Sequence, residues 1–346
     1  MRDSKFLSTN QHQKLESMKI INKVLRKLLY SALILLISSS LFYAQDDQSI
    51  LLSGKRILLI GDSITQDGTY VSFMEYYLES LYPEKKFDIT SIGLGGETTC
   101  GLTEPGHFKR PCIFSRLDST LAKIKPEIVF ACYGMNDGLY NPQDDKRFQA
   151  YKDGILKLIE KLKACGAKVI ILTPTVFDPL RIPEKVLKDN ETGYTYSKPY
   201  YKYDNVLADY SKWIMSLKIK DVQTIDLHTP MKKYLLKRHK EDPEFFINKD
   251  GIHPTPFGHL FMAKIILDKT GIPLHIKNLD NELKRDTSNT LFKLINNQRQ
   301  ILSKGWLEYI GYTARTTVKT NNIDTTEIKV SELQKQIDEL RREIKR

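Results

Sequence analysis

Residues 56–63 are Arg56-Ile-Leu-Leu-Ile-Gly-Asp-Ser63, a short apolar run that ends in a glycine, an aspartate and a serine. A run of this length, bounded by turn residues, predicts a buried β-strand. The glycine allows a tight turn, and Ser63 could cap a helix that follows it. The stretch therefore predicts a serine hydroxyl at the carboxyl end of a strand, which is where open parallel sheets bind their ligands.

Four further apolar runs follow, and amphipathic stretches separate them. This alternation predicts an α/β domain in which helices cover a parallel sheet. The predicted strands are residues 56–60, 87–92, 128–133, 168–173 and 222–226; the predicted helices are 68–82, 115–124, 145–165, 200–217 and 256–269. Polar residues and glycines gather where the strands end, at Asp62-Ser63, Gly95-Gly96, Asn136-Asp137 and Pro174.

The chain has 346 residues and a formal net charge of +11, which raises the question of nucleic-acid binding. The charge is unevenly spread, because residues 18–44 carry four basic and no acidic side chains and residues 271–346 carry fourteen basic and ten acidic ones. Residues 45–270 are nearly neutral and have no basic run interleaved with aromatic residues. A nucleic-acid partner is therefore not expected.

The N-terminal region has the order of an export signal. Four basic residues, from Lys19 to Lys27, precede an apolar run over 28–37, and three serines follow it. This order predicts a secretory signal peptide that starts at Met18 and is cleaved near Ala44. An uncleaved anchor is the alternative, but the run is shorter than the ~20 residues that span a bilayer. We predict a secreted or periplasmic protein with no membrane span in its mature form.

Residues 271–346 have a different pattern from the domain before them. A helix is predicted over Leu291–Trp306 and a polar linker over residues 312–328. Apolar residues then recur at alternating spacings of three and four, at Val330, Leu333, Ile337, Leu340 and Ile344. Two heptads are marginal for a coiled coil, so this helix could pack on the domain or support weak self-association. The predicted parts are residues 1–44 (extension and signal), 45–270 (catalytic domain) and 271–346 (helical C-terminal extension).

Two motifs at the ends of other strands could bind a developing negative charge. Gly134-Met-Asn-Asp137 follows the third strand, and the side chain of Asn136 can donate a hydrogen bond to an oxyanion. Gly93-Leu-Gly-Gly-Glu-Thr98 follows the second strand, and a glycine there can point its N–H into the same pocket. Each motif by itself is also a common turn.

A histidine with a nearby carboxylate follows late in the chain, in Asp250-Gly-Ile-His253. A carboxylate fixes the tautomer of a histidine, and a spacing of three residues allows Asp250 to fold back to the ring. His228, two residues after Asp226, competes for this role but is expected to structure a turn. The remaining histidines, His12, His107, His239, His259 and His275, lack a comparable pattern. No group of side chains has metal-ligand spacing, so no metal or other cofactor is predicted.

Together, these motifs resemble those of the SGNH, or GDSL, hydrolase family over about residues 55–270. Ser63 falls in the Gly-Asp-Ser block, Gly96 in the second block, Asn136 in Gly-x-Asn-Asp, and Asp250 with His253 in Asp-x-x-His. The chain departs from the pattern in the second block, where Ser91 or Ile92 stands in place of an asparagine that many relatives carry.

The resemblance implies a three-layer α/β/α, flavodoxin-like fold with five parallel strands in the order 2-1-3-4-5. It also implies a serine ester hydrolase that uses no cofactor. Ser63 would be the nucleophile, His253 the general base and acid, and Asp250 the residue that orients His253. The oxyanion hole would consist of the backbone N–H groups of Ser63 and Gly96 and the side chain of Asn136.

The family includes lipases, lysophospholipases, thioesterases and acetyl esterases that act on polysaccharides. Polar residues between the second and third blocks favour a hydroxylated substrate; they are Cys100, Glu104, His107, Lys109, Arg110 and Arg116. Tyrosines of later loops point the same way, although they could equally pack loops; they are Tyr140, Tyr194, Tyr196, Tyr200, Tyr201 and Tyr203.

We therefore expect a small-molecule or polysaccharide ester as substrate, with acetyl as the acyl group. A lipase, a lysophospholipase, a thioesterase or a non-catalytic binding module of the same fold are the alternatives. Cys100 and Cys112 lie in one stretch and could form a disulfide or remain free thiols.

Overall fold

The computed structural model describes residues 49–53, 56–106, 109–311 and 323–344. The chain divides into two units, Met1–Ser53 and Gly54–Arg346. The described part of the first unit is the short helix α2 (Ile50–Ser53). The predicted export signal lies outside the described residues and stays a prediction. All elements discussed below belong to the second unit.

The centre of the second unit is a parallel sheet of five strands. The strands are β1 (Arg56–Gly61), β2 (Asp88–Gly93), β3 (Ile128–Cys132), β4 (Lys168–Leu172) and β5 (Val222–Ile225). Their order is β2-β1-β3-β4-β5, which confirms the expected topology. Gly61 at the end of β1 pairs with Gly93 of β2 and with Cys132 of β3. The carboxyl ends of these three strands therefore lie side by side.

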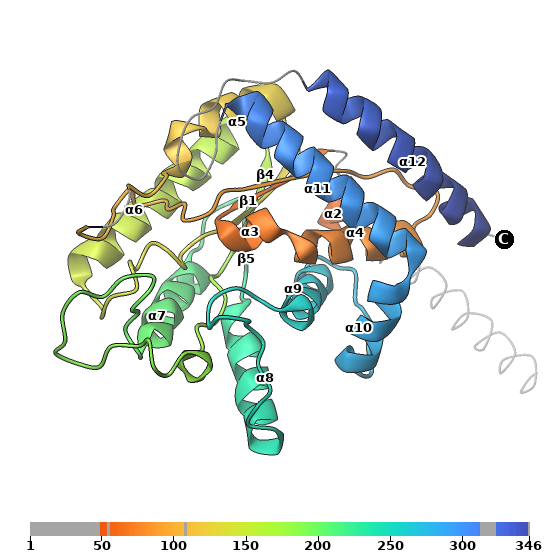
Figure 1. Ribbon diagram of the computed structural model, residues 1–346. Helices are drawn as coiled ribbons and strands as arrows, with labels where there is room; N and C mark the ends of the chain where they lie inside the picture. The colour runs from red at the N-terminus through yellow and green to blue at the C-terminus, as the bar shows by residue number, and fades with distance from the viewer. Residues whose placement is uncertain (1–48, 54–55, 107–108, 312–322, 345–346) are drawn as a thin grey trace, which may run out of the picture. The chain divides into compact units, whose positions relative to one another are not determined.

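Helices cover both faces of the sheet, which confirms the three-layer architecture (Figure 1). One face carries α5 (Leu117–Ile124), α6 (Asp145–Ala164) and α7 (Tyr203–Ser216). The other face carries α4 (Thr69–Leu81), α9 (Pro256–Lys269) and α11 (Thr290–Ile310). The remaining helices are α3 (Ser63–Asp67), α8 (His228–Glu241), α10 (Leu279–Ser288), α12 (Asp324–Ile344) and the 3₁₀ turns η1 (Ile113–Ser115) and η2 (Pro179–Arg181).

The burial of the strands explains why their sequences are continuous apolar runs. All five residues of the central strand β3 are buried, and β1 is buried from Ile57 onward. A strand that is covered on both faces has no solvent side, so it does not alternate apolar and polar residues. Within the described ranges, no helix is both long and apolar enough to cross a membrane.

The C-terminal helices pack on the α/β body. Phe292 of α11 stacks on Phe73 of α4 with ring centroids 4.5 Å apart. On α12, Ile337 is 1% exposed and Arg341 forms an ion pair of 2.5 Å with Glu79 of α4. The helix predicted from the apolar spacing therefore packs on the domain, which was one of the two alternatives.

The predicted linker over residues 312–328 is partly wrong. Residues 312–322 lie outside the described part of the chain, but α12 already begins at Asp324. Asp324 and Glu327 stand in the first turn of α12, where negative charge stabilises the helix dipole. The polar composition of residues 324–328 therefore reflects a helix start and not a linker.

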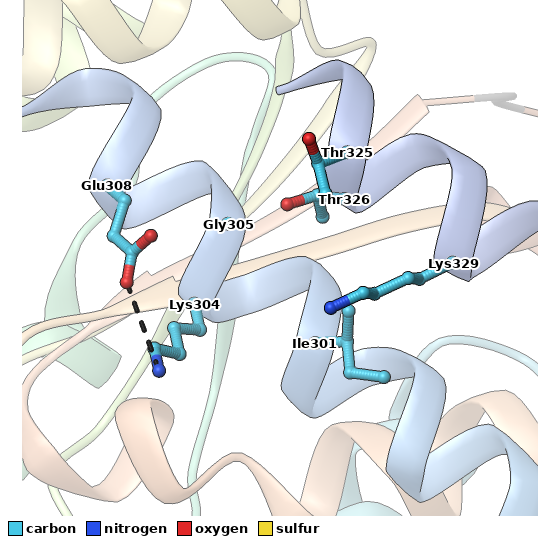
Figure 2. A pocket seen from close by; sticks show the side chains of 7 residues that line it. All are labelled: Ile301, Lys304, Gly305, Glu308, Thr325, Thr326 and Lys329. Atoms are coloured by element: carbon cyan, nitrogen blue, oxygen red, sulfur yellow. Dashed lines mark ion pairs between the residues drawn. The ribbon is translucent and has the colours of Figure 1, made fainter. Parts of the chain in front are cut away.

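A pocket of about 530 Å³ opens between α11 and α12 (Figure 2). Its lining residues are Ile301, Lys304, Gly305, Glu308, Thr325, Thr326 and Lys329. The two helices approach so closely here that a Cβ atom on Gly305 would lie 2.3 Å from the hydroxyl of Thr326. Its lining contains no histidine.

Glu75 of α4 is a buried carboxyl group, 8% exposed. Burial raises the pKa of Glu75 to about 8, and the charge of the neighbouring Glu79 adds to this effect. The folded protein therefore retains a proton that the unfolded chain, with an ordinary pKa near 4.5, has released. This contribution to stability is complete below about pH 4.5 and is lost as the pH rises towards 8.

The Glu75→Gln variant should therefore resist alkaline pH better than the wild type. Glutamine keeps the size of the side chain but cannot ionise, so we expect a melting temperature about 4 °C or more above wild type at pH 8. At pH 5 the two proteins should melt together. Thermal unfolding followed by circular dichroism measures both values. The control Glu160→Gln changes an exposed glutamate of α6 and should show no pH-dependent difference; an equal shift at both pH values for Glu75→Gln would contradict the prediction.

Candidate active site

Three of the predicted site residues lie at one edge of the sheet. Ser63 follows β1, Gly96 follows β2 and Asn136 follows β3, each within four residues of the strand end. Because these ends are in register, the three residues come together although they are separated by up to 73 positions in the sequence. This edge is where ligands bind in open α/β sheets.

Ser63 is the first residue of the short helix α3. The helix is capped by Asp62, whose side chain accepts a hydrogen bond of 3.0 Å from the backbone N–H of Ile64. Ser63 is therefore not the cap that its position suggested, and its hydroxyl is available for another partner. Burial raises the pKa of Asp62 to about 7 despite this hydrogen bond.

The end of β2 supports α3 directly. A Cβ atom on Gly93 would lie 2.0 Å from the backbone nitrogen of Gln66, so only glycine allows α3 to rest on this strand. Ser91 adds a hydrogen bond of 3.2 Å from its hydroxyl to the carbonyl of Thr65. The serine that departs from the family pattern therefore still connects β2 to α3.

The side chains of Asp250, His253 and Ser63 form a continuous hydrogen-bonded chain. Asp250 Oδ2 lies 2.7 Å from His253 Nδ1, and His253 Nε2 lies 2.8 Å from Ser63 Oγ. Asp250 Oδ1 also accepts the backbone N–H groups of His253 and Ile252 at 2.7 and 3.1 Å. Burial alone would raise the pKa of Asp250, but the hydrogen bonds from His253 outweigh it and lower the pKa to about 2. Asp250 is therefore ionised at neutral pH and holds the proton of His253 on Nδ1.

The loop that carries His253 is anchored to the turn after β4. Asn248 Nδ2 donates to the carbonyl of Val176 at 2.8 Å, and the N–H of Asp178 donates to the carbonyl of Gly251 at 2.9 Å. Gly251 has a φ of +80° and lies so close to Asp178 that a Cβ atom would be 2.8 Å from its carbonyl oxygen. A glycine is needed between Asp250 and His253 for both reasons.

Three groups at this edge of the sheet can donate a hydrogen bond to an oxyanion: the backbone N–H groups of Ser63 and Gly96 and the side-chain amide of Asn136. Within the described residues, no hydrogen bond from the backbone N–H of Ser63 or of Gly96 is found. Gly96 has a φ of +76°, a backbone conformation that favours glycine. Asn136 is 3% exposed and uses its Nδ2 group for one hydrogen bond of 3.2 Å, to the carbonyl of Glu97. The second hydrogen of that amide group has no other acceptor among the described residues.

Sequence reasoning missed two residues that hold Asn136 in place. Arg110 Nη1 and the hydroxyl of Tyr140 both donate to Asn136 Oδ1, at 3.1 and 2.9 Å. Both residues were singled out only as candidates for substrate contact. They are 3% and 1% exposed, so they lie behind the site and not in it. The sequence carries no signal for this role, because charged residues are mostly exposed and the burial of Arg110 is visible only in the structure.

The tyrosines expected around the substrate are mostly buried. Tyr140, Tyr194, Tyr200 and Tyr203 are at most 9% exposed and pack within the loops. Tyr196 is the exception, at 40% exposed, and its ring lies edge-on to the ring of His253 with centroids 6.4 Å apart. Tyr201 is half-buried and its hydroxyl donates to Asp189 at 2.9 Å. Of the six tyrosines expected near the substrate, only Tyr196 is exposed beside His253.

The competing histidines are bound elsewhere. His228 begins α8, and its Nε2 lies 3.2 Å from Asp204, a residue of α7 and not the Asp226 of the sequence motif. His259 was set aside for lack of a carboxylate pattern, but its Nε2 lies 3.1 Å from Asp67. Its Nδ1 accepts the backbone N–H of Tyr70, so this pair does not reach Ser63.

The cysteines near the site form no disulfide among the described residues. Cys100 and Cys112 are both free thiols, and burial raises the pKa of each. A protonated thiol is a weak nucleophile, so burial makes both cysteines unreactive. In the described part of the chain, no cluster of three or more His, Cys, Asp or Glu side chains is arranged to hold a metal ion. His107 lies outside the described residues.

Several solved structures are similar to this chain. A gut microbial diltiazem-metabolizing enzyme is similar at 21% identity with a TM-score of 0.50, and the match covers 63% of this chain and 47% of that one. A variant of Axe2, an acetyl xylan esterase from Geobacillus stearothermophilus, is 18% identical with a TM-score of 0.44 over 64% of this chain and 97% of that one. The acetyl xylan esterase AlAXEase is 19% identical with a TM-score of 0.44 over 62% and 98% of the two chains.

At the level of sequence, no curated protein matches the chain significantly. Residues 59–260 match the GDSL-like lipase/acylhydrolase family. This range is more than half of the chain, and it contains Ser63, Gly96, Asn136, Asp250 and His253. The protein therefore belongs to the GDSL-like lipase/acylhydrolase family, a family of carboxylic ester hydrolases.

Proposed function

We propose that the protein is an exported serine esterase that removes short acyl groups, with acetyl foremost, from hydroxylated substrates such as carbohydrates. The observation that supports this most is the chain of hydrogen bonds from Asp250 through His253 to Ser63, at 2.7 and 2.8 Å. A base that touches the hydroxyl and is itself oriented by a carboxylate is the arrangement that activates a serine.

In the first half of the reaction, Ser63 Oγ attacks the acyl carbonyl while its proton passes to His253 Nε2. The carbonyl oxygen becomes an oxyanion, which accepts hydrogen bonds from the N–H groups of Ser63 and Gly96 and from Asn136 Nδ2. His253 then gives the proton to the alkoxide that leaves, and the acyl group stays bound to Ser63 as an ester. Asp250 stabilises the imidazolium that forms between these transfers.

In the second half, a water molecule replaces the alcohol. His253 takes a proton from the water, and the hydroxide attacks the acyl carbonyl through the same oxyanion site. The tetrahedral intermediate collapses, the proton passes back to Ser63 Oγ, and the carboxylic acid leaves. The steps consume one ester and one water, and they return Ser63 and His253 to their starting protonation states.

Covalent labelling of Ser63 tests this proposal. A fluorophosphonate should react with the serine and give a peptide of residues around Ser63 with the mass of the phosphonate, and hydrolysis of p-nitrophenyl acetate should stop as labelling completes. A panel of p-nitrophenyl esters from acetyl to palmitoyl then gives the acyl preference, which should be highest at acetyl. Hydrolysis that continues after complete labelling, or a label on another residue, would refute the role of Ser63. A preference for chains beyond about eight carbons would refute the acetyl assignment.

Tyr196 is the residue that supports a carbohydrate as the substrate. Its ring is exposed beside His253 and lies edge-to-face against Tyr140, with centroids 5.5 Å apart, so it is held in position. An aromatic face at the mouth of a site can pack against the apolar face of a sugar ring at little cost in side-chain entropy. A small alkyl ester would not reach this surface.

The Tyr196→Ala variant should therefore raise the KM for an acetylated sugar about 5- to 10-fold, which is the range of one aromatic contact. The kcat for the same substrate and the kcat/KM for a small alkyl acetate should change less than about twofold. Steady-state kinetics on the two substrates measures the difference. Tyr201→Ala is the matched control, because Tyr201 lies in the same loop but bonds to Asp189. Equal losses on both substrates would instead assign Tyr196 to the support of His253.

A further inference from the structure

A buried guanidinium group lies directly behind the proposed oxyanion site. Arg110 Nη1 donates to Asn136 Oδ1 at 3.1 Å and to the carbonyl oxygen of Gly96 at 3.3 Å. These are two of the three residues whose N–H groups are expected to face the reacting carbonyl. One nitrogen of Arg110 therefore contacts the rear of both.

Arg110 is held in this position by its own partner. Its Nε and Nη2 groups donate to the two carboxylate oxygens of Glu104, at 2.6 and 2.5 Å. The side chains of Arg110 and Glu104 are 2% and 0% exposed. The remaining nitrogen, Nη1, is thus the one directed at Asn136 and Gly96.

The presence of a buried ion pair such as Arg110–Glu104 is not explained by a gain in stability. Removing two charges from water costs free energy that their attraction only partly returns, and apolar replacements are often as stable or more so. The Arg110–Glu104 pair lies in a loop and not between two packed helices. Its position against Asn136 suggests that orientation, and not stability, is what the pair supplies.

The pair determines which way the amide of Asn136 points. A guanidinium has only donors, so the atom of Asn136 that faces Arg110 has to be the oxygen. The hydroxyl of Tyr140 donates to the same oxygen at 2.9 Å. The Nδ2 group then has to face the opposite side, where one hydrogen meets the carbonyl of Glu97 and the other has no acceptor among the described residues.

The backbone around Tyr140 supports the same reasoning. Leu139 and Tyr140 have φ values of +52° and +56°, a conformation that non-glycine residues rarely adopt. Such strain persists where surrounding contacts require it, and it gathers at functional sites. Here it places the Tyr140 hydroxyl on Asn136 and its ring 5.5 Å from the guanidinium carbon of Arg110.

We propose that Arg110 is a positioning residue for ester hydrolysis: with Glu104 as its counter-ion, it holds the Asn136 amide with its N–H group towards the oxyanion and polarises that N–H. The inference rests on the proposed function of Ser63. A donor fixed before the reaction contributes more than one that has to be turned, because no reorganisation is needed when the charge develops. Arg110 therefore acts on the transition state through Asn136 and without touching the substrate.

The test is a double-mutant cycle between Arg110 and Asn136. The Arg110→Met/Glu104→Met protein removes both charges, so no unpaired carboxylate is left buried. Its kcat for p-nitrophenyl acetate should fall about 10- to 100-fold, somewhat less than the ~10²–10³ of a whole oxyanion donor. Its KM should change less than about threefold. In the Asn136→Ala background, the same two substitutions should cost less than about threefold, because the residue through which they act is gone.

Two further proteins make the cycle decisive. Arg110→Lys keeps a positive charge for Glu104 but cannot reach Asn136 and Gly96 as well. It serves as the test if the double variant does not fold. Its kcat should fall when Asn136 is present and should change little in the Asn136→Ala background. Arg341→Met/Glu79→Met removes a buried ion pair that joins α12 to α4 and does not include a residue of the proposed site, so it should leave kcat unchanged. Equal losses with and without Asn136, or no loss in kcat, would overturn the proposal. Ser63→Ala in the same assay distinguishes a failure of the Arg110 proposal from a failure of the proposed function. Activity that survives in Ser63→Ala would refute the esterase mechanism itself.

Discussion

Replacing Ser63 with alanine is expected to lower kcat/KM for an acetyl ester by at least about 10⁴-fold. The hydroxyl of Ser63 lies 2.8 Å from His253 Nε2, and no other nucleophile shares that hydrogen bond in the described residues. Without it, the oxyanion donors and His253 can only assist direct attack by water, which leaves a small residual rate. Steady-state hydrolysis of p-nitrophenyl acetate measures the loss. Thermal unfolding should be within a few degrees of wild type, because among the described residues the removed oxygen bonds only to His253.

The matched control for this variant is Ser91→Ala. Ser91 is buried on β2, and its hydroxyl donates to Thr65 on the same helix that Ser63 begins. If a small disturbance of α3 were enough to abolish activity, Ser91→Ala would reproduce the loss. We expect less than about a tenfold change. Full activity in Ser63→Ala would mean that another residue carries the acyl group.

Replacing Asp250 with asparagine is expected to lower kcat by about 10³- to 10⁴-fold at neutral pH. The carboxylate of Asp250 accepts the Nδ1 proton of His253, which leaves Nε2 free to accept the proton of Ser63. An asparagine can keep the backbone hydrogen bonds at Oδ1 but presents its amide N–H groups to Nδ1. The proton of the imidazole then moves to Nε2, which can no longer act as a base.

The low pKa of Asp250 also predicts how the rate depends on pH. Because the hydrogen bonds from His253 lower that pKa to about 2, the carboxylate stays ionised throughout the range in which an esterase is assayed. Protonation of Asp250 should therefore not lower the wild-type rate anywhere between pH 6 and 9. Asp67→Asn is the control, since it changes another carboxylate beside a histidine, His259, that does not contact Ser63. A comparable loss in Asp67→Asn would contradict the specific role of Asp250.

The sheet and the position of the site could be predicted because they depend on local patterns. Strands β1 to β4 are short, mostly apolar runs that are buried in the structure, whereas in the edge strand β5 only Ile225 is buried. The helices that the sequence missed lack such a pattern. In α8 only His228, Met231 and Leu235 are buried, and in α10 only Asp286 is, so neither has the broad apolar face that predicts a helix. Polar contacts hold α10, such as the hydroxyl of Tyr77 on Asp286 at 2.5 Å, and Tyr234 of α8 packs on the rings of Phe257 and Phe261.

The support of the site could not be predicted in the same way. Arg110 and Glu104 are ordinary charged residues in a polar loop, and nothing in their spacing distinguishes them from solvent-exposed ones. The six tyrosines of the later loops also have similar neighbours in the sequence, so the sequence does not show which of them is exposed. In the structure, only Tyr196 is exposed beside His253. Burial decides these roles, and burial depends on what the rest of the chain places around each residue.

The sequence by itself determined the succession of the five strands along the chain, the serine at the end of β1, and the pairing of Asp250 with His253. These features are settled within a few residues, where chain geometry leaves little choice. Only the tertiary structure decided that His253 meets Ser63 across 190 positions and that Arg110 is directed at Asn136. It also decided that α12 packs against α4. Contacts between distant residues arise from the packing of whole elements, and the close packing of a protein interior selects one arrangement among the many that local patterns allow.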